Sequence, residues 1–517
     1  MYSTKRQIPP RKIAVLHFTR RPYPVDPAFF GQNFIPLSLS ACSRSEQFRE
    51  YGMKNHAFVR EVPKCEGIRK DMEEISRVRF NTELHFGYGD PRVVLSMVKG
   101  MVDEGYLPVL DFHYPVQDSR LMVQLDKALR EMGIRERVVI VNHLHITPQY
   151  IRAIPGDNDI RGGVRKTNAG RILQLEPALQ VSDLTIGVSE DAINAFRRIR
   201  YNQWDNRPDG ALLRSGDLGE AIGERYCAIL NGINPNLYTP RTEDEKEEGR
   251  ASIGLNPKLG ITASYVARLD GLKGGRTLIE ILRRYNGWYG GNRDEWGFVL
   301  ACADIIQPTT RLGYIKDLLK LKRLIESDRL KVVIDISKFT RGDPRFRDAV
   351  IRILEYYAND GGFEEIRKMR IFGGYVDTPI QGVTDVLLHT AVHEALGLAL
   401  VEANFSGAGV IARKVGGIPE VIPTNKEHDL KVYERGGSGR YHTRTVSYSE
   451  HGILIHQEGA EDSELDATIF MQIMDLLKPD PNGKGSVAPI EVRDRFSEAT
   501  MTARYLDAVI RANEVRV

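Results

Sequence analysis

The residues from His393 to Ile422 run HEALGLALVEANFSGAGVIARKVGGIPEVI, and this stretch predicts the architecture around it. The composition of residues 396–405 favours a helix, and residues 408–412 form an apolar run typical of a buried strand. The pair Gly416 and Gly417 predicts a turn where backbone can approach a ligand closely. Pro419 and Glu420 fit the first turn of a second helix. Two helix N-termini are therefore expected near strand ends, where backbone N–H groups can bind an anion.

Two carboxylates lie within this stretch. Glu394 and Glu402 stand eight residues apart, with Gly397 between them. On a helix this spacing is a little over two turns, so both side chains could share one side. A carboxylate can accept two hydroxyl groups at once, which suits the vicinal diols of a sugar or a ribose. The alternative is a capping acid followed by a solvated mid-helix acid, and the pair taken alone favours this alternative.

Composition sets limits on the class of protein. The 517 residues are enough for two or three domains, and the 42% hydrophobic content supports buried cores. Lys and Arg number 72 and Asp and Glu 69, so the net charge of +3 gives no strong attraction to nucleic acid or an anionic membrane. Four widely spaced cysteines show no metal-ligand spacing and indicate reduced thiols. We find no signal-peptide pattern and no membrane-spanning run, so we expect a cytoplasmic protein, with peripheral membrane contact left open.

Apolar runs alternate with helical segments along both halves of the chain, which predicts an α/β protein with parallel sheets. The clearest strand candidates share a short apolar core; they are residues 12–18, 108–112, 137–141, 183–189, 261–267, 298–303, 332–336, 369–372, 384–388 and 452–455. Helices are expected at 171–179, from 190, from 275 through 282, at 462–477 and at 491–513. The polar segment 426–449 is expected to be a surface insertion.

Histidines follow two of the predicted strands. His113 comes after 108–112 and His143 after 137–141. Ligands bind at the carboxyl ends of strands in open α/β sheets, so one of the two is a candidate functional residue. The alternative, that both are loop histidines with satisfied hydrogen bonds, stays open. Asp111 precedes His113 by two residues.

A loop in the second half combines two cations with a helix start. Arg268 and Lys273 flank the loop after the strand 261–267, followed by Gly274 and Gly275. Two cations at a strand end and a helix N-terminus predict a phosphate-binding site.

The polar segment 146–170 has two interpretations, a mobile surface loop or an acceptor lid with an anion-binding edge. It contains Asp157 and Asp159, spaced like a metal-binding carboxylate pair. Ile154, Pro155 and Gly156 precede them, which favours a turn over a metal site.

Taken together, the motifs resemble glycosyltransferase family 4, which carries Glu-x7-Glu around a glycine, then Gly-Gly-x-Pro-Glu, and Arg-x4-Lys-Gly upstream. The chain departs from the family pattern at Leu396, where an aromatic residue is common, and at Ala267, where glycine is usual. The resemblance is dense from residue 231 to 455 and sparse from 12 to 189.

The resemblance implies a GT-B architecture, two Rossmann-like domains with a cleft between them. The expected domains are residues 1–235 on the acceptor side and 236–490 on the nucleotide-sugar side, with the C-terminal helix 491–517 packing back on the first. The residues implied are His143 and Glu394 at the transferred sugar, and Gly31, Arg268, Lys273, Gly397, Leu398 and Glu402 at the donor. Glu402 would hold ribose hydroxyls, and Arg268 and Lys273 the diphosphate.

The function implied is a retaining, metal-independent glycosyltransferase of the hexosyltransferase type. It would use a UDP- or GDP-linked sugar, no cofactor and no metal, and a sugar, small-molecule, lipid or protein acceptor. Alternatives are an epimerase or a phosphorylase on the same architecture, and a non-catalytic nucleotide-sugar-binding protein. The oligomeric state is left open.

Overall fold

The computed structural model describes most of two compact units. The residues described are 12–19, 39, 42–43, 45–60, 66, 70, 73–74, 76–77, 81–87, 90–113, 115–145, 168–207, 210–233, 238–267, 269, 271–288, 296–302, 317, 329–334, 380–433, 441–449, 451–457, 463–476 and 494–515. Unit 1 comprises Met1–Ile233 together with Arg495–Val517, and unit 2 comprises Asn234–Asp494.

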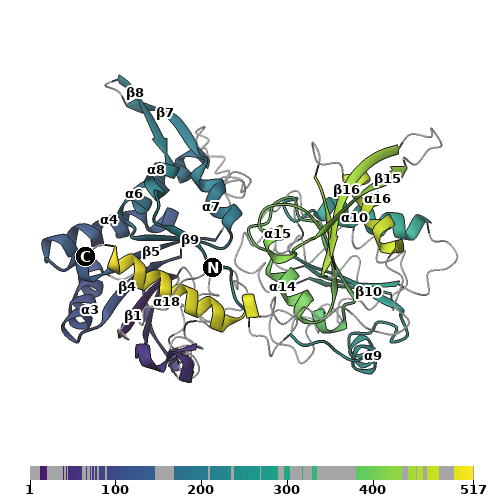
Figure 1. Ribbon diagram of the computed structural model, residues 1–517, viewed down its shortest axis with the longest axis horizontal. Coiled ribbons are helices and arrows are strands. Elements are labelled where there is room, and N and C mark those ends of the chain that lie inside the picture. Colours follow the sequence, from purple (N-terminus) through teal and green to yellow (C-terminus); the bar gives the residue numbers. More distant parts are fainter. Residues whose placement is uncertain are drawn as a thin grey trace. The chain divides into compact units, whose positions relative to one another are not determined.

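Unit 1 is built on a seven-stranded parallel sheet (Figure 1). In spatial order its strands are β3 (Thr82–Phe86), β2 (Lys54–Val59), β1 (Ile13–Thr19), β4 (Leu107–Phe112), β5 (Val139–Leu144), β6 (Leu184–Gly187) and β9 (Tyr226–Ala228). Its helices are α3 (Pro91–Asp103), α4 (Pro115–Glu131), α6 (Asn168–Val181), α7 (Glu190–Arg197), α8 (Leu218–Ile222) and α18 (Glu498–Glu514). The strand order reverses between β1 and β4, the arrangement of a doubly wound sheet.

The two faces of this sheet bury different helices, because successive side chains of a strand point to opposite faces. Ala14, Leu16 and Phe18 of β1 pack with helices α3 and α4. Ile13 and Val15 pack instead with residues of α18, including Tyr505. The last helix of the chain therefore covers one face of the first sheet, as Figure 1 also shows.

Unit 2 holds an eight-stranded mixed sheet. Its order is β12 (Leu330–Ile334), β11 (Trp296–Cys302), β10 (Ile261–Ala267), β13 (Val386–His389), β14 (Gly409–Arg413), β17 (Gly452–Ile455), β16 (Tyr441–Ser449) and β15 (Lys426–Tyr433). The first six strands are parallel, and the last two join antiparallel. The helices are α9 (Glu243–Ser252), α10 (Gly275–Trp288), α14 (Leu398–Phe405), α15 (Ile418–Val421) and α16 (Ser463–Leu476). Here the order reverses between β10 and β13.

Most predicted strands are confirmed, and the strand predicted at 261–267 coincides with β10. The strand predicted at 369–372 lies outside the described residues. The polar segment 426–449, predicted to be a surface insertion, contains the hairpin of β15 and β16, which extends the sheet beyond β17. Most described side chains of β15 are exposed. The strands of this hairpin are rich in polar residues, as an edge hairpin permits, and that polarity concealed them. A second hairpin, β7 (Arg200–Arg207) with β8 (Gly210–Asp217), also had no apolar signal.

The described part of the chain contains no helix with both the length and the apolar character needed to cross a membrane.

Candidate functional site

In unit 2 three loops meet at the carboxyl ends of β10, β13 and β14, which are neighbours in the sheet. β10 is flanked by β11 on one side and β13 on the other, so chain connections leave it in opposite directions. In doubly wound sheets the crevice at such a reversal is where ligands bind. The loop after β10 contains Lys273, the loop after β13 contains Glu394, and the loop after β14 contains Gly416.

The Lys273 loop is tied to the loop after β13 by hydrogen bonds. The Thr390 hydroxyl donates to the carbonyl oxygens of Lys273 and Gly274, at 3.0 Å each. The Val392 N–H donates to the Leu272 carbonyl at 2.9 Å. Gly274 has φ +68°, and a Cβ there would lie 1.9 Å from the Thr390 carbonyl oxygen. Only glycine fits this close approach, so the position of Lys273 is set by backbone packing.

The Glu394 carboxylate contacts the side chains of Lys273 and His389. Lys273 Nζ lies 2.5 Å from Glu394 Oε2, and His389 Nε2 lies 3.1 Å from the same oxygen. The side chains of Lys273 and Glu394 retain 17% and 12% of their exposure, so the pair is largely shielded from water. Burial alone would raise the pKa of the Glu394 carboxyl, but Lys273 and His389 hold that pKa well below its usual range. Glu394 is therefore an ionised acceptor.

The two glycines after β14 fix the backbone of Glu394. The Gly417 N–H donates to the Glu394 carbonyl at 3.1 Å. Gly416 has φ +54°, and a Cβ there would lie 1.8 Å from the Glu394 carbonyl oxygen. The turn at Gly416 and Gly417 thus packs against the backbone carbonyl of Glu394, and this contact orients Glu394.

The helix after Glu394 begins later than the sequence analysis assumed. α14 starts at Leu398, with Gly397 as its N-cap at φ +91°. Glu394 lies four residues before Leu398, in the loop, whereas Glu402 lies within the helix and is half-buried. The expectation that the two acids share one side of a helix is therefore wrong, because the left-handed glycine turns the chain between them.

In unit 1 a second polar cluster lies at the reversal between β1 and β4. Asp111 on β4 is fully buried, and it contacts His17, His113 and His143. Burial alone would raise the pKa of the Asp111 carboxyl, but His143 and His113 hold it well below its usual range. Burial lowers the pKa of His113 to about 4, although Asp111 opposes that shift. This cluster is a buried anion surrounded by imidazoles.

His143 lies inside the end of β5 rather than after it, and it is 1% exposed. Its Nε2 lies 2.5 Å from Asp111 Oδ1, and its ring stacks on Tyr505 of α18 with centroids 6.1 Å apart. His113 follows β4 directly, as predicted.

Of the predicted site residues, Lys273, Glu394, Gly397 and Leu398 lie around the loops at the β10–β13 reversal, with Glu402 farther along α14. His143 belongs to unit 1. Gly31 and Arg268 lie outside the described residues, as do Asp157 and Asp159.

Sequence reasoning missed His389, His17, His145 and Tyr505. His389 ends β13, and histidine at a strand end was the signal used for His113 and His143. His145 follows His143 by two residues, the spacing that places two side chains on one face of a strand. His17 and Tyr505 carried no such signal, because their neighbours come from distant parts of the chain.

Three solved structures that resemble this chain in fold are remote from it in sequence. HepE from Anabaena, determined with UDP, matches with TM-score 0.54 and 16% identity over 96% of this chain and 100% of HepE. Sucrose-phosphate synthase from Thermosynechococcus elongatus gives 0.53 and 15% over 98% and 100%. The catalytic domain of starch synthase IV from Arabidopsis thaliana, bound to ADP and acarbose, gives 0.53 and 12% over 97% and 100%. No protein-family model and no curated protein sequence matches.

These structural neighbours are glycosyltransferases of the GT-B type, with two Rossmann-like domains. Together with the two doubly wound sheets described above, they confirm the predicted α/β, GT-B fold.

Proposed function

We propose that the protein is a retaining glycosyltransferase of the hexosyltransferase type, which moves a sugar from a nucleoside-diphosphate sugar to an acceptor. The observation that carries the proposal is the ion pair between Lys273 and Glu394, placed at the reversal between β10 and β13. Lys273, a cation that can bind a diphosphate, and Glu394, an anion that can accept sugar hydroxyls, lie side by side at the edge where doubly wound sheets bind ligands. The UDP in HepE and the ADP in starch synthase IV support a nucleotide donor.

Lys273 would neutralise the diphosphate as it leaves. An ammonium has three N–H donors, so Lys273 can keep its contact with Glu394 while it donates to a phosphate oxygen. The charge of Glu394 holds the ammonium in place before the donor binds. Arg268, five residues upstream, is proposed as the second cation, and together they would perform the electrostatic task that a metal ion performs elsewhere.

Glu394 would contact the transferred sugar. Its hydrogen bonds from described residues both end on Oε2, so Oε1 is the oxygen that would accept a sugar hydroxyl. Glu402 on α14 would accept the ribose hydroxyls, and the backbone at Gly397 and Leu398 would lie against the diphosphate. The roles that the resemblance gives to Gly31 and His143 stay predictions.

The reaction proposed is attack by an acceptor hydroxyl on the anomeric carbon, on the face from which the diphosphate leaves. The bond from the anomeric carbon to the phosphate oxygen breaks, and the acceptor proton passes to the leaving phosphate. Retention then needs no nucleophile from the protein. A UDP- or GDP-linked hexose is the proposed donor.

A donor panel tests this function. The full-length protein is incubated with UDP-, ADP- and GDP-linked hexoses, and the released nucleoside diphosphate is quantified by chromatography. We expect release from one donor class, slow with water alone, and faster with the right acceptor. An epimerase would instead return an altered nucleotide sugar. A phosphorylase would require phosphate, and a binding protein would leave every donor intact.

A further inference from the structure

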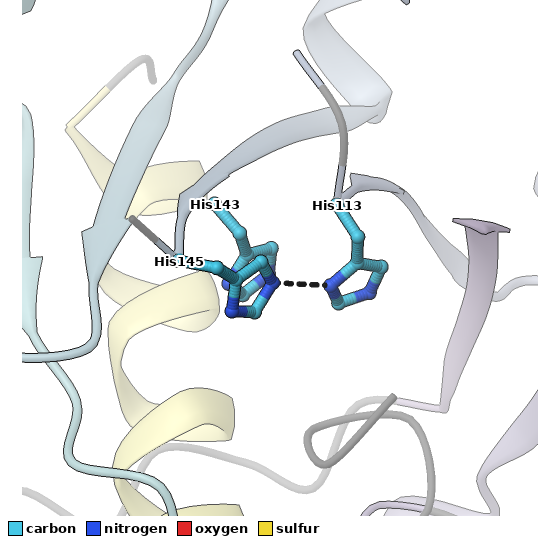
Figure 2. Close-up of side chains that lie close together, drawn as sticks. All are labelled: His113, His143 and His145. Atoms are coloured by element: carbon cyan, nitrogen blue, oxygen red, sulfur yellow. Dashed lines mark hydrogen bonds between the residues drawn. The ribbon is translucent and has the colours of Figure 1, made fainter. Parts of the chain in front are cut away.

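The end of the first sheet gathers four histidines and Asp111 on one face. In the parallel register of β1 and β4, His17 is paired with Asp111. In the register of β4 and β5, Phe112 is paired with Asn142, so the next residues, His113 and His143, lie beside each other. Residues two apart on a strand share a face, so Asp111 and His113 on one strand and His143 and His145 on the next point the same way. Figure 2 shows His113, His143 and His145 with their rings close together. This is also the face that α18 covers.

Hydrogen bonds to Asp111 decide which nitrogens of these rings carry a proton. Asp111 Oδ2 lies 2.7 Å from His17 Nδ1 and 3.0 Å from His113 Nε2. Asp111 Oδ1 lies 2.5 Å from His143 Nε2. An ionised carboxylate only accepts hydrogen bonds, so these nitrogens donate, and in a neutral ring the opposite nitrogen carries a lone pair. His113 Nδ1 and His143 Nδ1 are therefore lone-pair acceptors.

Buried lone pairs in this cluster lack donors. His143 Nδ1 and His145 Nδ1 are buried and have no hydrogen-bond partner among the described residues. His113 Nδ1 has only the contact with His145 Nε2, at 3.0 Å. Leaving polar atoms buried without a partner is costly, and such atoms in a native protein call for an explanation. A cation that accepts several lone pairs would provide one.

We propose that His113, His143 and His145 bind one divalent transition-metal ion, of which zinc is the representative. Each histidine offers one ring nitrogen, and the three ligand atoms lie within 4.8 Å of one another. Two nitrogens on a tetrahedral zinc ion, each about 2.0–2.1 Å from it, lie about 3.3 Å apart, so a contraction of at most about 1.5 Å completes the site.

Asp111 would act as the outer partner that orients the ligands. Histidines that bind zinc usually donate their other ring N–H to a carboxylate, which fixes the ring and strengthens the ligand nitrogen. Asp111 stands in this relation to both His113 and His143. Imidazole nitrogens favour zinc, copper or nickel over magnesium or calcium, which prefer oxygen.

The ligands of this proposed site belong to unit 1, whereas Lys273 of the proposed diphosphate site belongs to unit 2. The metal site does not rest on the proposed function. Coordination through Nδ1 and the hydrogen bond through Nε2 would use both nitrogens of His143. The metal would then replace the sugar contact predicted for His143, and the expectation of a protein without metal would be wrong for unit 1.

Metal content is the first test. The full-length protein is incubated with zinc, passed through gel filtration in metal-free buffer, and analysed by mass spectrometry. We expect about one zinc ion per wild-type chain. His145→Gln, which replaces the ligand that keeps some exposure, should bind zinc about 100-fold more weakly or worse. Circular dichroism checks that the variant is folded.

His56→Gln is the matched control. His56 is a buried histidine on β2 of the same sheet, and it lies in another group of potential ligands with Glu83 and His85. The control variant should keep its zinc. Zinc lost from His56→Gln but kept by His145→Gln would overturn the proposal.

A spectroscopic readout needs no variant. Cobalt(II) in place of zinc should give the strong visible absorption of a tetrahedral ion with nitrogen ligands, and zinc should abolish it by displacement.

Asp111→Asn should weaken zinc binding by about 10–100-fold if Asp111 orients the ligands. Wild-type protein that retains no zinc and shows no cobalt absorption contradicts the site, whatever donor-panel activity it has.

Discussion

Lys273 Nζ and Glu394 Oε2 lie 2.5 Å apart, although 121 residues separate them along the chain. The neighbouring strands β10 and β13 bring them together. Their loops pack closely at Gly274, Gly397 and Gly416, where a Cβ atom would collide with neighbouring atoms. The fold therefore forms the ion pair before any donor binds. Lys273 lowers the pKa of Glu394, and Glu394 holds the ammonium group of Lys273 in place.

Lys273→Ala should weaken the binding of a nucleoside diphosphate far more than that of the nucleoside. The substitution removes a charge-assisted contact worth about 1.5–3 kcal/mol, whereas the nucleoside lacks the phosphates. Calorimetric titration of both ligands measures the difference. An equal loss for the two ligands would refute the phosphate assignment.

The double variant Lys273→Met with Glu394→Gln controls for the charge left behind. Removing Lys273 alone leaves the Glu394 carboxylate without its cation, and that defect could distort the loop. The double variant is neutral at both positions, so it should keep nucleoside binding and still lack the extra affinity for the diphosphate. Wild-type affinity for the diphosphate in this variant would show that Lys273 does not bind it.

The stability contributed by Glu394 should depend on pH in one direction. Lys273 and His389 hold the pKa of Glu394 below its ordinary value of 4.5, against the opposing effect of burial. A carboxyl with a depressed pKa in the folded protein stabilises it fully above the pKa of the unfolded chain, and that contribution is lost as the pH falls through the folded pKa. Urea unfolding of wild type and Glu394→Gln should therefore give a difference that is constant above about pH 5.5 and shrinks below about pH 4.5. A difference that grows on acidification would contradict the ion pair.

Two glycines of one loop should respond differently to alanine. A Cβ at Gly274 would lie 1.9 Å from the Thr390 carbonyl oxygen at φ +68°, whereas a Cβ at Gly271 meets nothing within 4 Å. Gly274→Ala should cost about 2 kcal/mol or more of unfolding free energy and reduce diphosphate binding. Gly271→Ala should stay within about 0.5 kcal/mol of wild type. Similar melting temperatures for the two variants would show that the contact with Thr390 does not fix the Lys273 loop.

The two glutamates should affect different kinetic parameters. Glu402→Gln removes a charged acceptor for ribose hydroxyls, so it should mainly raise the donor KM, by about tenfold. Glu394→Gln removes a contact to the transferred sugar that strengthens as the ring flattens in the transition state, so kcat should fall by about 100-fold. Initial rates over a range of donor concentrations separate the effects. Near-normal kcat in Glu394→Gln with no turnover in Glu402→Gln would reverse the assignment.

The doubly wound sheets were predictable because parallel strands are buried on both faces and appear as continuous apolar runs, as at 261–267. The polar hairpin of β15 and β16 carried no such signal, since an edge hairpin needs little apolar surface. The turn at Gly416 and Gly417 was predicted, but the close contact of Gly416 with the Glu394 carbonyl is revealed only by the fold. The predicted close approach of this backbone to a ligand stays a prediction.

The polar partners were harder to predict. Lys273 and Glu394 were expected to bind different parts of one donor, and their mutual contact follows only from the pairing of β10 with β13. The Asp111 cluster depends in the same way on the register between β1, β4 and β5. Sequence spacing alone indicates that His143 and His145 share a face, but it does not place His17 or Tyr505 near them.

One measurement tests the proposed retaining transfer most directly, the proton NMR time course of a reaction with the donor that the panel identifies. With high enzyme concentration and water as the acceptor, the first anomeric signal can be recorded before the free sugar equilibrates. The account predicts that this signal has the anomeric configuration of the donor and grows in step with the nucleoside diphosphate. A first signal with the opposite configuration, or a changed nucleotide sugar with no nucleoside diphosphate released, would contradict it.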